Sequence, residues 1–242
     1  MSARFERAIW DPVEALPRER LRELQLDRLR ATVAHVLDAQ PLGAVRLAGA
    51  GVERAEDIAS LGDVARLPFS YKSDLRDHYP FGLLAVPRKH LVRLHASSGS
   101  HGKPTVVGYT RADLDAWAEL MARCMTMAGV RSGMVIHNAN AYGLFTGGLG
   151  FHDGGERLGA TVIPVSGGFT SRQAMLLSDL GGEVLAATPS YALVIAQAVR
   201  DAGIDPAELN LELGLFGGEP FSEAMRAQIE RELGLSLSLI HI

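Results

Sequence analysis

The sequence contains one cysteine, Cys124, so a disulfide within the chain is excluded. Scarce cysteine is typical of a reducing compartment, and we expect a cytoplasmic protein. Cys124 falls in a helical pattern of apolar residues, where we expect a buried and inert thiol. The first residues, MSARFERAIWDP, place charges where a signal peptide needs an apolar stretch. No apolar run approaches the roughly 18 residues of a membrane span, so we expect no membrane association.

The chain also lacks a strong charge of either sign. Its formal net charge is −4 and its isoelectric point is near 6.1, which gives no electrostatic footprint for nucleic acid. N-terminal arginines are interleaved with acidic residues such as Glu19 and Asp27, a pattern typical of a solvated helix face. Eight histidines are present, but none pairs with Cys124 or another histidine at zinc-binding spacing. We therefore predict no structural metal.

Apolar residues are plentiful, at 47%, which is enough for a buried core. Residues 17–38 carry leucines and valines at helical spacing and predict an amphipathic helix. Residues 67–87 are punctuated by prolines and predict irregular structure. From residue 91 onward, short apolar strands alternate with helices, which predicts an α/β fold with a mostly parallel sheet flanked by helices. Ligands of such sheets bind outside the carboxyl ends of the strands.

The segment LHASSGSHGKPTVVGYT, residues 94–110, gathers serines, glycines and a lysine in one loop. Glycines let backbone N–H groups turn inward as an anion-binding nest, and Lys103 adds a mobile positive charge. A Walker A loop is excluded, because only two residues separate Gly99 from Gly102 and Pro104 follows the lysine. The flanking residues predict a strand–loop–strand hairpin. The residues alone leave two interpretations open, a phosphate cradle and an ordinary surface turn.

This loop resembles the phosphate loop of the adenylate-forming acyl-CoA synthetase superfamily. Five further segments resemble, in the same order, segments of the phenylacetate–CoA ligase family: DLRDHYPFGLLAVP, YGLFTGGLG, GGERLGATVIPVSGG, TPSYAL and FGGEPFSEAMR. The match extends from about residue 60 to residue 235. It implies an acid–thiol ligase of aromatic catabolism. In this reaction, ATP and an arylacetic acid give an acyl-adenylate and pyrophosphate, and coenzyme A then takes the acyl group as a thioester.

The resemblance implies roles for individual residues. The residues expected to hold the ATP phosphates are Ser97, Ser98, Gly99, Ser100, Gly102, Lys103 and Thr105. His101 departs from the family, which has a hydroxyl residue there. The residues expected at the aryl and acyl pocket are Tyr142, Phe145, Gly147 and Gly218, where an aromatic floor suits a phenyl ring. Two core aromatics under a loop are the alternative interpretation of Tyr142 and Phe145.

The turn expected to face adenine comprises Gly217, Gly218, Glu219 and Pro220. Gly218 replaces an alanine that is frequent in the family, which would slightly enlarge the pocket. Glu219 is alternatively an ordinary turn carboxylate. For the full-length enzyme the resemblance implies ATP, Mg²⁺ and coenzyme A as cofactors and co-substrates. It implies small-molecule partners, and it leaves a homodimer open.

The expected organisation is an incomplete large N-terminal domain of an adenylate-forming enzyme. Residues 1–90 form its helical and irregular segment, and residues 91–235 form an α/β AMP-binding core. Residues 236–242 are an atypical tail, in which Leu239 and His241 stand where the family has aspartate and tyrosine. The small C-terminal domain and its catalytic lysine have no counterpart. The resemblance therefore implies a fragment that lacks the strand after its last helix, contains no catalytic residue and is inactive alone.

A second hypothesis from another class is a non-catalytic domain that binds a nucleotide or an aryl acid. A downstream tyrosine–glycine–leucine–serine–glutamate segment in the encoding DNA would favour the ligase. A native stop after Ile242 would favour the binding domain.

Overall fold

The computed structural model describes residues 8–97, 102–235 and 237–240. The chain divides into two compact units, Asp11–Leu114 and Asp115–Ile242, the second of which includes Met1–Trp10. The division falls inside the helix α4 (Arg111–Ala128), whereas the sequence placed a boundary near residue 90. The predicted strand–loop–strand hairpin therefore clusters with the N-terminal unit.

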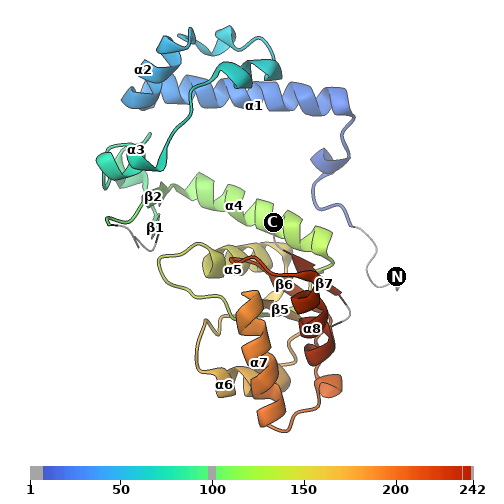
Figure 1. Ribbon diagram of the computed structural model, residues 1–242. Helices are drawn as coiled ribbons and strands as arrows, with labels where there is room; N and C mark the ends of the chain where they lie inside the picture. Colours follow the sequence, from blue (N-terminus) through green and yellow to red (C-terminus); the bar gives the residue numbers. More distant parts are fainter. Residues whose placement is uncertain (1–7, 98–101, 236, 241–242) are drawn as a thin grey trace. The chain divides into compact units, whose positions relative to one another are not determined.

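The described part of the N-terminal unit is mostly helical (Figure 1). Its elements are η2 (Pro12–Ala15), α1 (Arg18–Ala39), α2 (Pro41–Gly49), η3 (Ala55–Asp57), η4 (Leu61–Arg66), α3 (Lys72–Asp77), η5 (Arg88–His90), β1 (Arg93–Ala96) and β2 (Val106–Tyr109). Helix α1 confirms the helix predicted at residues 17–38, but its packed apolar side is limited to the stretch from Leu26 to Leu37. It buries Val33 against Leu47 of α2, with Val52 and Ile58 completing the cluster.

The prediction of irregular structure at residues 67–87 is wrong at α3. The carboxylate of Asp74 accepts a hydrogen bond from the backbone N–H of Tyr71 at 2.8 Å and so caps this short helix. Asp74 also receives two hydrogen bonds from the Arg46 guanidinium, at 2.6 and 2.8 Å. This bidentate pair ties α3 to α2, a tertiary contact that the local sequence does not reveal.

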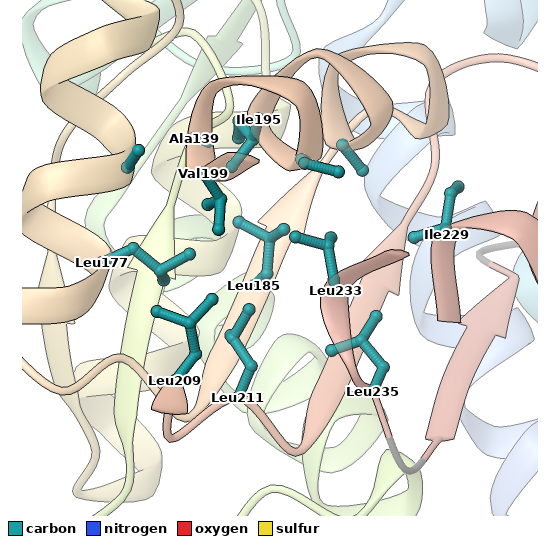
Figure 2. Close-up of a cluster of buried hydrophobic side chains, with 14 of the residues drawn as sticks. Ala139, Leu177, Leu185, Ile195, Val199, Leu209, Leu211, Ile229, Leu233 and Leu235 are labelled. Atoms are coloured by element: carbon teal, nitrogen blue, oxygen red, sulfur yellow. The ribbon is translucent and has the colours of Figure 1, made fainter. Parts of the chain in front are cut away.

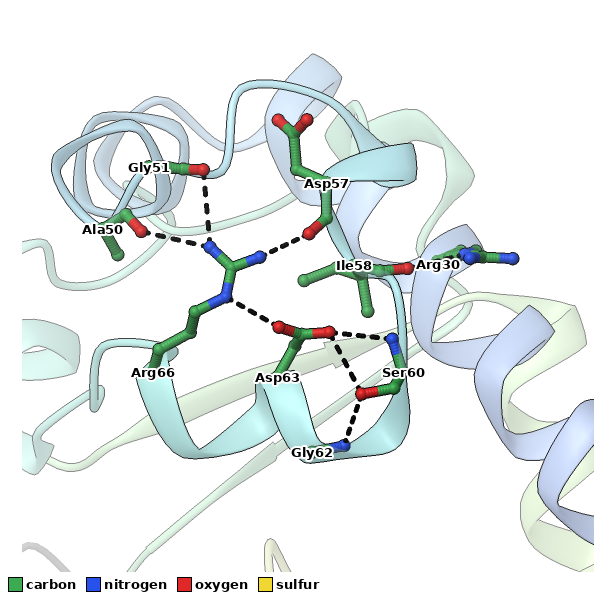
Figure 3. A network of polar contacts seen from close by, with 9 residues as sticks. All are labelled: Arg30, Ala50, Gly51, Asp57, Ile58, Ser60, Gly62, Asp63 and Arg66. Atoms are coloured by element: carbon green, nitrogen blue, oxygen red, sulfur yellow. Dashed lines mark hydrogen bonds and ion pairs between the residues drawn. The ribbon is translucent and has the colours of Figure 1, made fainter.

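Arg66 organises the turns that connect α2 to η4 (Figure 3). Its guanidinium donates to the backbone carbonyls of Ala50, Gly51 and Asp57, and its Nε donates to Asp63 at 3.0 Å. Asp63 in turn accepts from the backbone N–H of Ser60 at 2.7 Å. One arginine thus satisfies carbonyls that the short turns leave without helical partners.

The other unit is an α/β structure. Together with the C-terminal part of α4, its described elements are β3 (Val135–Asn138), α5 (Gly147–Leu158), β4 (Thr161–Ile163), α6 (Thr170–Asp179), β5 (Val184–Ala187), α7 (Pro189–Asp201), η6 (Pro206–Glu208), β6 (Leu213–Phe216), α8 (Glu223–Leu233) and β7 (Leu237–Ile240). Within the described residues they form a five-stranded sheet in the order β4-β3-β5-β6-β7, and every neighbouring pair is parallel. The predicted parallel sheet flanked by helices is confirmed.

Side chains alternate between the two faces of the central strands, as a pleated strand requires. Leu185 of β5 packs into a cluster with residues of α6, α7 and α8, part of which Figure 2 shows. Its neighbours Val184 and Ala186 pack into a second cluster with residues of α4 and α5. Within the described residues, helices therefore cover both faces of the central strands, which leaves the ends of these strands as the place where a ligand meets them.

The expectations for the strand after the last helix and for Cys124 are wrong. The last helix does not lack its next strand, since β7 pairs with β6 from Leu213↔Leu237 to Phe216↔Ile240. Cys124 is exposed, because the side of α4 that faces the core is formed by other residues, such as Met125.

Thr110 and Asp113 form the predicted cap of α4, and Ser222 caps α8. In the described part of the chain, no helix is long and apolar enough to cross a membrane.

Candidate functional site

A pocket of about 660 Å³ lies at the carboxyl ends of three parallel strands. Segments that follow β3, β5 and β6 contribute to its wall, as do the first turn of α5 and one side of α4. Its lining residues are Trp117, Met121, Asn140, Ala141, Phe145, Thr146, Gly147, Gly148, Gly150, Phe151, Thr188, Gly217 and Gly218. The location is the one that parallel α/β sheets use for ligands. The wall combines three aromatic rings with a glycine-rich backbone, which suits a flat apolar group.

Helix α5 carries five glycines, and four of them have no room for a Cβ. A Cβ on Gly148 would collide with the carbonyl of Ala141, and one on Gly155 would lie 2.6 Å from Val162 of β4. Gly150 and Gly154 lie one turn apart and face Trp117 and Met121 of α4. Each glycine costs about 1 kcal/mol in helix propensity. Close packing against β4, α4 and the preceding loop explains why α5 nevertheless carries them.

Asn138, the last residue of β3, holds the loop that precedes α5. Its side chain is fully buried, and its Nδ2 donates to the carbonyl of Gly148 at 2.8 Å and to the hydroxyl of Tyr142 at 2.7 Å. Its Oδ1 accepts from the backbone N–H of Asn140 at 3.2 Å. One buried amide thus fixes the loop of residues 139–148, which supplies much of the pocket wall. Sequence reasoning missed Asn138, although its place at a strand end was a usable signal.

Tyr142 is not among the residues that line this pocket. Its hydroxyl accepts from Asn138 and lies 3.2 Å from Nδ1 of His152, whose Nε2 lies 3.1 Å from Glu156. Burial raises the pKa of Tyr142 to about 12, although the hydrogen bond from Asn138 opposes the shift. Tyr142 therefore stays protonated at neutral pH and can donate to His152. In this structure its hydroxyl ties the loop to Asn138 of β3 and His152 of α5.

The other predicted acyl-pocket residues, Phe145, Gly147 and Gly218, do line the pocket, as does Gly217 from the predicted adenine-side turn. Gly218 has φ +87°, a conformation that disfavours any residue with a Cβ. Their contact with a ligand stays a prediction. Sequence reasoning missed Trp117 and Met121, because their position on α4 gave no sign of what that helix packs against.

Glu219 and Pro220 do not line this pocket. Glu219 instead accepts a hydrogen bond from the backbone N–H of Ser190 at 2.6 Å, at the start of α7. Hydrogen bonds from the hydroxyl and the N–H of Ser190 lower the pKa of Glu219. The contact joins the turn after β6 to the helix after β5, so the carboxylate has a structural role at the strand ends. Its predicted place beside adenine is untested.

The predicted phosphate loop lies in the N-terminal unit, between antiparallel strands β1 and β2, which confirms the strand–loop–strand prediction. Ser98, Gly99, Ser100 and His101 lie outside the described residues. Ser97 and Thr105 close the loop with two hydrogen bonds of 3.0 Å. The backbone N–H of Ser97 donates to the carbonyl of Thr105, and the backbone N–H of Thr105 donates to the hydroxyl of Ser97. Thr105 also has a buried hydroxyl that makes no hydrogen bond within the described structure.

Gly102 and Lys103 occupy the described part of the loop tip, and both are exposed. Gly102 has φ +121°, a conformation natural only to glycine. The ammonium of Lys103 lies 5.2 Å from the centroid of the Tyr79 ring. A cation–π contact at an exposed site is weak, so Lys103 can leave it for a stronger anionic partner.

A separate polar cluster holds the loop between β4 and α6. Buried His137 of β3 has its Nε2 2.6 Å from Oε1 of Gln173, and the amide of Gln173 donates to the carbonyls of Ser166 and Gly168. Burial lowers the pKa of His137. The neutral imidazole can therefore donate from Nε2 to Gln173. None of these residues lines the pocket, so we assign the cluster to the fold.

Comparisons with solved structures identify the class. A 2-hydroxyisobutyryl-CoA ligase in an open conformation, in complex with 2-HIB-AMP and CoA, is 30% identical to this chain with a TM-score of 0.85. The match covers 93% of this chain and 54% of that one. The same ligase in its thioesterification state gives a TM-score of 0.86 and 29% identity, over 93% and 49% of the two chains. The fold is that of the adenylate-forming CoA ligases.

Among CoA ligases, curated phenylacetate–coenzyme A ligases are similar to this chain at higher sequence identity. The phenylacetate–coenzyme A ligase of Thermus thermophilus is 52% identical over 229 residues, which is 95% of this chain and 51% of that protein. The enzymes of Pseudomonas putida and Escherichia coli are 48% and 47% identical, over 96% and 93% of this chain and 52% of each relative. No model of a known protein family matches. The chain spans about half the length of these relatives, and over that half the predicted resemblance to the phenylacetate–CoA ligases is confirmed.

Proposed function

We propose that the protein is a phenylacetate–CoA ligase. It activates phenylacetate, or a close arylacetic acid, with ATP to an acyl-adenylate and then transfers the acyl group to coenzyme A. The observation that carries this proposal is the aromatic and glycine-lined pocket at the ends of β3, β5 and β6, in a chain so similar to phenylacetate–CoA ligases. The ligands of the solved CoA ligase, an acyl-AMP and CoA, support ATP and coenzyme A as the co-substrates.

We propose that different residues bind the aryl group and the ATP phosphates. The rings of Phe145, Phe151 and Trp117 offer faces and edges to an aryl group. Gly217 and Gly218 let a flat ring approach the backbone. Lys103 and the donors of its loop are proposed to hold the ATP phosphates, where fixed donors stabilise the charge that develops during adenylation.

Mg²⁺ is proposed to accompany ATP. Within the described residues, no three His, Cys, Asp or Glu side chains are grouped as metal ligands. Mg²⁺ is usually bound through one or two carboxylates, water and substrate phosphates, so the phosphate oxygens of ATP are its natural ligands. We assign no chemical step to the metal.

The proposal also includes a cytoplasmic location and a homodimer of the full-length protein.

The test is capture of the adenylate by the full-length native protein. Incubation with ATP, Mg²⁺, phenylacetate and hydroxylamine should give phenylacetohydroxamate and pyrophosphate in equal amounts. Coenzyme A in place of hydroxylamine should give phenylacetyl-CoA. Saturable binding of phenylacetate or ATP without pyrophosphate release would contradict the proposal and favour a non-catalytic binding domain.

A further inference from the structure

Trp117 is the one aromatic ring of the pocket wall that comes from α4. The other two, Phe145 and Phe151, come from the loop before α5 and from α5 itself. Trp117 is partly buried, and Met121 lines the same pocket one turn further along α4. The indole therefore forms the part of the pocket wall that α4 contributes, together with Met121.

Gly150 lets the indole of Trp117 lie directly against α5. A Cβ on Gly150 would lie 2.8 Å from Cζ2 of Trp117, 3.1 Å from Cε2 and 3.2 Å from Nε1. The indole therefore occupies the space that any other residue at position 150 would fill with its side chain. Gly154, one turn further along α5, leaves room for the side chain of Met121 in the same way. The indole packs against the backbone of α5, which cannot move aside as a side chain can.

We propose that Trp117, seated on Gly150, determines which arylacetic acids the pocket accepts by limiting the size of their ring. This inference rests on the proposed function and adds to it a residue pair that sets the ring size. A phenyl ring fits between Trp117 and the glycines that follow the strands, whereas a fused second ring meets the indole. A close-packed wall of this kind discriminates by steric exclusion, which one or two extra ring atoms are enough to trigger.

The two residues predict opposite shifts in selectivity. Trp117→Phe removes one ring of the indole without adding atoms, so it opens the pocket. Gly150→Ala adds a methyl group at the wall and pushes the indole inward, so it narrows the pocket. In the double variant the smaller phenyl ring leaves room for the new methyl group, so selectivity should return toward that of the unmodified protein.

The experiment measures kcat/KM for acyl-CoA formation with 2-naphthylacetate and with phenylacetate, using the full-length native protein. We expect Trp117→Phe to raise the ratio of the two values by about tenfold, and Gly150→Ala to lower it by a similar factor. Gly155→Ala is the matched control. Its new methyl group would meet Val162 of β4 and Ile136 of β3, which do not line the pocket, so it strains the contact of α5 with the sheet and leaves the indole in place, and the ratio should not change.

The possible results separate the two claims. A raised ratio in Trp117→Phe with an unchanged ratio in Gly155→Ala supports the inference, whether or not Gly150→Ala folds, and a lowered ratio in Trp117→Phe overturns it. Full activity on phenylacetate with the same ratio in Trp117→Phe as in the unmodified protein overturns the inference and leaves the proposed function standing. No acyl-CoA from any arylacetic acid with the unmodified protein overturns both.

Discussion

Asn138 and Tyr142 are joined by a 2.7 Å hydrogen bond from the amide of the first to the hydroxyl of the second, four residues further on. The bond makes the end of β3 and the start of the pocket loop one unit, because the same amide also binds Gly148 at the start of α5. The loop that carries Phe145 is thereby held at both ends. The shape of the pocket wall depends on a side chain that does not itself line the pocket.

Tyr142→Phe should destabilise the protein by about 1 to 2 kcal/mol, because it removes the contacts of the hydroxyl with Asn138 and His152 and a protein hydrogen bond is typically worth about 1 kcal/mol. The variant should also lose the part of the decrease in unfolding free energy at alkaline pH that is due to ionisation of Tyr142. The pKa of Tyr142 is raised from 10.0 to about 12, so its stabilising effect is complete below pH 10 and is lost as pH rises through 12. Urea unfolding at neutral pH and between pH 9 and 11 tests both effects. Tyr71→Phe, at an exposed tyrosine, is the control, and equal curves for the two variants would contradict the role of Tyr142.

Asp74→Asn should remove part of the acid sensitivity of the N-terminal unit. Hydrogen bonds from Arg46, then from the N–H of Tyr71, lower the pKa of Asp74 from 3.8 to about 2. The stabilisation is therefore complete above pH 3.8 and is lost as pH falls through 2. The urea midpoint of the unmodified protein should fall over that range, and that of the variant should fall less. Asp77→Asn, at the exposed end of the same helix, should behave like the unmodified protein, and identical pH curves for all three would contradict the prediction.

Glu219→Gln should lower stability above the ordinary pKa of glutamate, about 4.5, and have little effect well below it. Hydrogen bonds from Ser190 depress the pKa of Glu219 in the folded protein, so the carboxylate stabilises the fold above 4.5 and loses this effect as pH falls through its lower folded value. Thermal unfolding at pH 7 and pH 3 measures the difference. If KM for ATP rose tenfold while stability at pH 7 stayed the same, the carboxylate would belong to the nucleotide site rather than to the start of α7.

Lys103→Ala should impair the use of ATP without affecting the fold. The side chain is exposed, and the contact described for it, with the ring of Tyr79, is weak. We expect a higher KM for ATP or a slower adenylation step, with the melting temperature unchanged within about 1 °C. Lys89→Ala, at another exposed lysine of the same unit, should change neither. A lower melting temperature with normal ATP kinetics would make the loop an ordinary surface turn.

The strand and helix pattern of residues 91–233 was predictable, because alternating apolar strands and capped helices are local signals. Thr110 with Asp113 and Ser222 with α8 are examples in which the capping residues lie beside the helices they begin. The hairpin around Lys103 followed in the same way from Pro104 and the β-branched residues after it.

Tertiary contacts decided the rest. The cap of α3 depends on Asp74, whose partner Arg46 lies 28 residues earlier. The exposure of Cys124 depends on which side of α4 packs on the sheet, and the place of Trp117 depends on a glycine of α5. Strand β7 pairs with the edge of β6 through backbone hydrogen bonds, which depend little on side chains, so its atypical sequence did not reveal this pairing.

The ratio of kcat/KM for phenylacetate to that for decanoate, measured as acyl-CoA formation by the full-length native protein, tests the central claim most directly. The aromatic wall of the pocket and its glycine-lined turn predict a clear preference for the planar arylacetic acid. Faster acyl-CoA formation from decanoate than from phenylacetate would contradict the assignment of the pocket and of the substrate class.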